Sequence, residues 1–229
     1  MRTPALCLLL SLVSTNAFAA LVLDQEYNPG ALGKVGSNTF ITGGQYKSDL
    51  AQTFTVGQAG QLKAVEMYLV NTSATQPLQV ELRTTAAGKP TSTVLASVSL
   101  LPSQVPTISQ IPGIIGDYTP WGGPMTRFEF PGVAVTPGDV LAVSIRTTDP
   151  QVSYQWIVPS ALHISDPPYP KYLGGSLWTT STLDPDWVTS PTTSGVFRTF
   201  VDVVPEPASL ALLLPAMAMG LALVRRKSL

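Results

Sequence analysis

The chain has few residues able to do acid–base or nucleophilic chemistry. His163 is its one histidine, so a Ser-His-Asp arrangement would have to use it, because that site needs an imidazole to take the serine proton. No serine stands in a G-x-S-x-G sequence, and His163 lies close to prolines in a loop-like segment. One imidazole also cannot supply a multi-histidine metal site. The sequence therefore predicts a surface or packing role for His163, and a protein that is not an enzyme.

The carboxylates are scattered along the chain. Asp184 and Asp186 flank a proline, and Asp117 and Asp166 stand in other loop-like segments. Loop carboxylates of this kind could contribute to a Ca²⁺ site, which takes about six to eight oxygen ligands. An Asp-Pro-Asp sequence is equally well explained as a turn, and no EF-hand spacing is present. The sequence predicts no cofactor, and a Ca²⁺ site at Asp184 and Asp186 is the alternative. A glycosidase needs two carboxylates at one site, and the sequence places no two of them together.

Aromatic residues gather in one third of the chain, and several stand in segments rich in proline and glycine. Exposed rings on a rigid scaffold could stack against the apolar faces of sugars. The alternative is that these rings close the ends of a core while their N–H and O–H groups reach solvent. The candidates for a ligand platform are Tyr118, Trp121, Trp156, Tyr172, Trp178 and Trp187.

Charge and cysteine usage exclude several classes of protein. The formal net charge is −1 and charged residues make up 12% of the chain, so no basic patch for nucleic acid is expected. The one cysteine, Cys7, lies in the apolar N-terminal stretch. The rest of the chain therefore has no disulfide, zinc-thiolate site or thiol nucleophile.

The N-terminus has the pattern of a secretory signal peptide. Arg2 supplies a positive charge, an apolar stretch covers residues 5–13, and Ala17-Phe18-Ala19 is an A-x-A cleavage sequence. Residues 1–19 are thus predicted to be removed, leaving a chain that starts at Ala20.

The elements that must position any site are predicted to be strands. No window between residues 20 and 203 has a helical period. Instead, apolar and polar residues alternate in short runs, as where Leu78, Val80 and Leu82 alternate with Gln79, Glu81 and Arg83. About eight to ten such runs, separated by turn sequences, predict an all-β domain over 20–203, an antiparallel β-sandwich or jelly roll. Residues 24–49 are glycine-rich and predict turns and short edge segments, and residues 102–124 predict a long loop.

The C-terminal segment, residues 204–229, predicts a membrane anchor. Its apolar run, residues 208–224, has 17 residues without charge, close to the length that an α-helix needs to span a bilayer. Arg225, Arg226 and Lys227 follow at once, and such a cluster stays on the cytoplasmic side. A single transmembrane helix is predicted, with the body of the protein outside.

Two resemblances follow from these patterns. Pro205-Glu206-Pro207, the short apolar helix and the terminal basic cluster together resemble the PEP-CTERM sorting signal of exported bacterial proteins. That resemblance implies processing by an exosortase-type membrane enzyme, with the helix as a transient anchor. Residues 50–146, with Gly88-Lys89-Pro90 and Pro137-Gly138-Asp139 among their turns, resemble the "choice-of-anchor" surface domains, which implies a β-sandwich without catalytic residues.

The predicted function follows from this organisation. The chain is expected to be exported, anchored in the inner membrane as a precursor, and then placed at the cell surface or outside the cell. A structural or interaction role linked to exopolysaccharide or the biofilm matrix is the first hypothesis. The alternative is a carbohydrate-binding module that uses the aromatic residues between 118 and 187.

Overall fold

The computed structural model describes residues 20–28, 36–43, 49–110, 124–149, 152–160, 171–180, 185–190 and 193–203. The compact unit runs from Ala20 to Val203, and its described part is made of strands and two short 3-10 turns. No helix among the described residues has the length and apolarity to cross a membrane. The predicted signal peptide, residues 1–19, and the predicted sorting segment, residues 204–229, lie outside the described residues.

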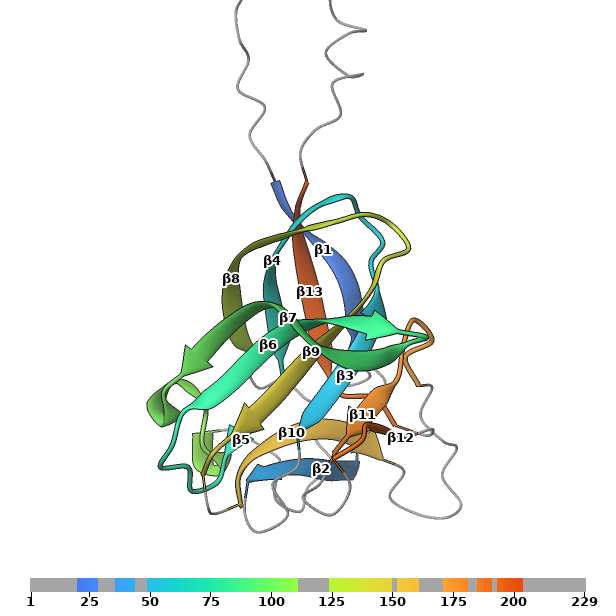
Figure 1. Ribbon diagram of the computed structural model, residues 1–229. Helices are drawn as coiled ribbons and strands as arrows, with labels where there is room; N and C mark the ends of the chain where they lie inside the picture. Colours follow the sequence, from blue (N-terminus) through green and yellow to red (C-terminus); the bar gives the residue numbers. More distant parts are fainter. Residues whose placement is uncertain are drawn as a thin grey trace, which may run out of the picture. The chain divides into compact units, whose positions relative to one another are not determined.

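The strands form three antiparallel sheets (Figure 1). The four-stranded sheet has the order β1 (Ala20–Tyr27), β13 (Phe197–Val203), β4 (Gly60–Met67) and β8 (Thr126–Val135). The three-stranded sheet has the order β2 (Gly36–Gly43), β10 (Val152–Ser160) and β5 (Leu69–Asn71). The six-stranded sheet has the order β12 (Val188–Ser190), β11 (Leu177–Thr179), β3 (Leu50–Thr55), β9 (Val140–Thr147), β6 (Leu78–Ala86) and β7 (Lys89–Leu100).

One hydrophobic core lies between the four-stranded and six-stranded sheets. Phe197 of β13 contacts Phe54 of β3, with ring centroids 6.0 Å apart, and forms a T-shaped pair with Tyr172, with ring centroids 5.1 Å apart. Leu62 and Phe128 from one sheet belong to the same buried cluster as side chains from the other. The predicted all-β class with antiparallel sheets is therefore confirmed, and the packing is consistent with the predicted β-sandwich.

Strand β6 shows why the alternating sequence makes this fold. Leu78, Val80 and Leu82 are fully buried, whereas Gln79 and Glu81 are partly exposed. Successive side chains of a strand point to opposite faces, so the sheet buries one set and leaves the other at its outer face. The register places Val80 between Ile145 of β9 and Val98 of β7.

Strand β1 corrects the prediction for the start of the domain. The sequence predicts turns and short edge segments over 24–49, but β1 and β2 are eight-residue strands, each at the edge of its sheet. Strand β1 pairs with β13 along its whole length, from Ala20 opposite Val203 to Tyr27 opposite Phe197. The first and last strands of the compact unit are therefore neighbours. In the segment predicted as a long loop, residues 102–104 and 108–110 form the two 3-10 turns.

Candidate functional site

Two aromatic candidates belong to the core. Trp156 of β10 is fully buried, and its Nε1 donates a hydrogen bond to the carbonyl of Val196 at 3.0 Å. Tyr172 is buried, and its hydroxyl donates to Gln25 Oε1 at 2.7 Å. For these two rings the structure agrees with the packing alternative and not with a ligand platform, because each fills core volume and satisfies its polar atom inside the protein.

The other candidates differ in position. Trp178 of β11 and Trp187, just before β12, are both partly exposed. Asp186 is exposed, and the described residues contain no group of three or more histidine, cysteine or acidic side chains that could hold a metal. Tyr118, Trp121, His163 and Asp184 lie outside the described residues.

The register of the six-stranded sheet places Trp178 in a row of side chains on the sheet's outer face. Trp178 is opposite Ala51 of β3, Ala51 is opposite Ser144 of β9, and Ser144 is opposite Glu81 of β6. Glu81 is in turn opposite Ser97 of β7. Most of their neighbours along these strands are buried core residues, so this row lies on the face of the sheet opposite the core. Within the row Ala51 and Ser144 are themselves buried, and Trp178, Glu81 and Ser97 reach the surface.

A second row lies next to the first. Arg146 of β9 is opposite Gln79 of β6, and Gln79 is opposite Ser99 of β7, to whose Oγ its amide donates at 3.0 Å. Asp49 directly precedes β3, and continuing the register of that strand places it opposite Arg146. We call the two rows together the polar track; its members are Asp49, Gln79, Glu81, Ser97, Ser99, Ser144, Arg146 and Trp178.

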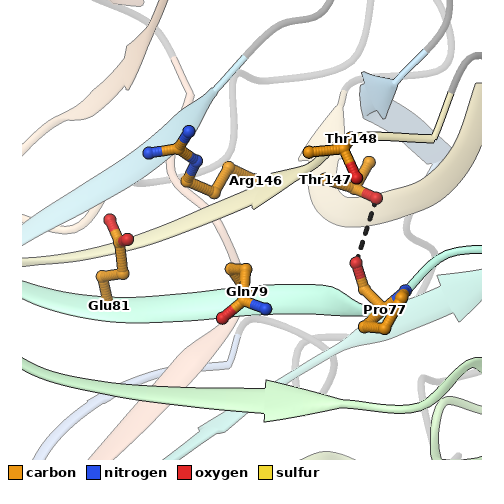
Figure 2. A pocket seen from close by; sticks show the side chains of 6 residues that line it. All are labelled: Pro77, Gln79, Glu81, Arg146, Thr147 and Thr148. Atoms are coloured by element: carbon orange, nitrogen blue, oxygen red, sulfur yellow. Dashed lines mark hydrogen bonds between the residues drawn. The ribbon is translucent and has the colours of Figure 1, made fainter.

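A pocket of about 230 Å³ opens on the polar track. Figure 2 shows Gln79 and Glu81 reaching it from β6, and Arg146 from β9. At its other end the hydroxyl of Thr147 donates to the carbonyl of Pro77 at 3.1 Å, which joins the end of β9 to the start of β6. The lining residues are Pro77, Gln79, Glu81, Arg146, Thr147 and Thr148.

One charged pair of this face is fixed in place. Glu81 and Arg83 form an ion pair, and their side chains are 13% and 10% exposed. The Arg83 guanidinium also donates to Ser144 Oγ and to the carbonyl of Thr91, both at 3.0 Å. An almost buried guanidinium with three partners keeps a defined position, so this pair forms a rigid base beside the pocket.

Asp49 and Arg146 are the second charged pair, and they are more accessible. Arg146 is exposed and Asp49 is partly exposed. Burial raises the pKa of the Asp49 carboxyl above its usual value, and the positive charges of Arg146 and Arg83 offset part of that rise. With Glu81 and Arg83, the described residues around the pocket include two acidic and two basic side chains, whose charges balance.

The polar track is suited to binding. Carboxylates accept hydrogen bonds, guanidinium groups donate them, and the Gln79 amide does both. Ser144 Oγ accepts a hydrogen bond from the Arg83 guanidinium. A guanidinium cannot take the proton of the serine hydroxyl, so Arg83 does not activate Ser144 as a nucleophile.

The outer face of the four-stranded sheet has a different character. Glu26, Arg198, Glu66, Arg127 and Glu129 form a chain of ion pairs across its four strands. The Arg127 guanidinium also lies 4.8 Å from the centre of the Phe200 ring. These cations already have partners, so this face offers a control surface for experiments on the polar track.

Sequence reasoning missed the polar track as a site. The alternation in the sequence places Gln79, Glu81 and Arg83 on one face of a strand, but Asp49 and Arg146 join them only through the strand register. Comparison of the chain with protein-family models and with curated proteins finds no match. Function has to be inferred from the geometry of the site and from the sequence patterns.

Proposed function

We propose that this chain is an exported, non-enzymatic protein of the bacterial surface or extracellular matrix, and that its polar track holds polysaccharide. The observation that carries the proposal is the alignment of hydrogen-bonding side chains in two adjacent rows on one sheet, beside a pocket and a partly exposed tryptophan. A sugar chain needs many modest hydrogen bonds and a ring surface, and the polar track offers both.

The dimensions of the polar track support an extended ligand. Strands in a sheet are about 4.8 Å apart, so the four intervals from β11 to β7 span about 19 Å. The side chains come from regular strands, which position groups more precisely than loops do. A polymer lying across the strands would meet the ring of Trp178 at β11, Asp49 beside β3, and polar side chains from β9, β6 and β7.

The sequence patterns support the route outside the cell. A signal peptide over residues 1–19 and a transmembrane helix over 208–224 bracket the compact unit, whose strands begin at Ala20 and end at Val203. Pro205, Glu206 and Pro207 with the basic cluster at 225–227 are the proposed recognition features for an exosortase-type enzyme. The membrane is then the partner of the precursor, and matrix polysaccharide the partner of the product.

The test is binding of the purified full-length protein to a panel of polysaccharides. Affinity gel electrophoresis and tryptophan fluorescence would be measured for the wild type, for Trp178→Ala and for Arg127→Gln on the other sheet. We expect at least one polysaccharide to retard the wild type and Arg127→Gln alike, and to retard Trp178→Ala less. If no polysaccharide retards the wild type, or if Arg127→Gln is the variant that loses binding, the proposed site is wrong.

A further inference from the structure

The polar track has a charge balance that selects among polysaccharides. Its two carboxylates, Asp49 and Glu81, lie near two guanidinium groups, Arg83 and Arg146, and the other three groups all act on the carboxyl group of Asp49. An acidic polymer would bring its own carboxylates toward both acids, and the cation bound to Glu81 is already engaged. The net field therefore gives an anionic ligand no advantage over an uncharged one.

Asp49 and Arg146 are the pair still available to a ligand. Continuing the register of β3 places Asp49 opposite Arg146 of the neighbouring strand β9. Among the described residues, neither of these side chains forms a hydrogen bond. One group only accepts and the other only donates. Two neighbouring hydroxyls of a sugar, one donating and one accepting, match such a pair.

Trp178 lies far enough from this pair to contact a different sugar of the same polysaccharide chain. Arg146 is two strands and two residues away from Trp178, which corresponds to roughly 12 Å between their Cα atoms for standard strand spacing and rise. The indole Nε1 is buried and has no hydrogen-bond partner in the described part of the chain, while the residue as a whole is partly exposed. The polar edge of the indole is thus turned into the protein, and the surface left to a ligand is carbon.

We infer that the polar track binds an uncharged polysaccharide, with Asp49 and Arg146 hydrogen-bonded to neighbouring hydroxyls of one sugar and Trp178 in contact with a sugar further along the chain. This inference rests on the proposed function and adds the chemical class of the ligand. It assigns Arg146 as a hydrogen-bond donor to hydroxyls, not as a partner for a carboxylate or phosphate.

The test compares uncharged and acidic polymers on the full-length protein. The uncharged probes are dextran, laminarin and mannan; the acidic probes are alginate and polygalacturonate. Each is measured at low and high salt against the wild type, Arg146→Gln, Asp49→Asn and the control Arg127→Gln, with thermal melting to show that every variant is folded. We expect an uncharged probe to bind with an affinity that salt changes less than twofold, and Arg146→Gln to weaken it about tenfold or more.

Three results would overturn the inference. Preferential binding of an acidic probe that weakens as salt rises would mean that Arg146 acts as a charge, while the proposed polysaccharide function would stand. Binding of an uncharged probe unaffected in both folded variants, Arg146→Gln and Asp49→Asn, would remove this pair from the site. Failure of every probe to bind would refute the proposed function itself, and the inference with it.

Discussion

Replacing Val80 by aspartate tests the facing of β6 directly. Val80 has no exposed surface and lies between Ile145 and Val98 inside the core. Losing its burial costs about 2 kcal/mol. The ordinary pKa of an aspartate lies about three units below pH 7, so keeping the introduced carboxyl neutral at pH 7 costs about 4 kcal/mol more. The sum, about 6 kcal/mol, is comparable with the whole stability of a typical domain, about 5–15 kcal/mol.

Urea unfolding followed by circular dichroism would measure the effect. The matched control is Gln79→Asp, the next residue on the same strand, whose side chain is partly exposed on the outer face; we expect a change below about 1 kcal/mol there. A carboxyl with a raised pKa in the folded state is penalised above its unfolded pKa. The destabilisation by Val80→Asp should therefore shrink toward about 2 kcal/mol as the pH falls below about 4. Equal unfolding midpoints for the two variants at pH 7 would refute the assigned faces of β6.

Three further predictions concern alkaline pH, a buried amide and the C-terminal segment. Burial raises the pKa of three tyrosines to about 12, namely Tyr27, Tyr154 and Tyr172. Because unfolded tyrosine ionises near pH 10, stability should fall between about pH 10 and 12 by up to about 3 kcal/mol per residue; tyrosinate absorbance that develops near pH 10 while the fold persists would contradict this. Gln52→Met removes the buried acceptor of the Gly195 N–H, a 2.9 Å hydrogen bond. We expect the free energy of unfolding, measured by heat or urea, to fall by about 1–3 kcal/mol. The control Gln58→Met, at an exposed position, should lower it by less than about 0.5 kcal/mol. Deleting residues 205–229 should convert a membrane-retained precursor into a freely soluble product on cell fractionation, and retention of the shortened chain would exclude the anchor.

The strands with clear alternation were predictable, and β1 was not. In β6 the period of two is present in the sequence itself, so its buried face could be assigned from Leu78, Val80 and Leu82. Strand β1 has no such pattern beyond Leu23, and three polar residues follow. Its conformation depends on β13: the Gln25 N–H, for example, donates to Thr199 Oγ1, 174 positions later in the chain. Local propensity cannot reveal a strand that exists through pairing of this kind.

The aromatic candidates show the same limit at the level of side chains. The alternation in β10 places Tyr154 and Trp156 on one side of the strand, and both are fully buried. Ser153 and Ile157, on the other side, are fully buried as well, because Ile157 joins a second cluster with Tyr68, Val70 and Val196. Of residues 153–158 only Gln155 is partly exposed, so the alternation of this strand does not separate a buried side from an exposed one, and burial depends on the packing of the sheets.

The sequence by itself determined the all-β class, the alternating faces of strands such as β6, and the two terminal patterns from which export is proposed. These features depend on the order of residues that are close together in the chain, so they can be predicted from the sequence. Only the tertiary structure decided that Asp49, Arg146, Glu81 and Trp178 share one surface. Their meeting depends on the hydrogen-bond register between strands far apart in sequence. A slip of one residue in any of those strands would turn its polar side chain to the other face of the sheet.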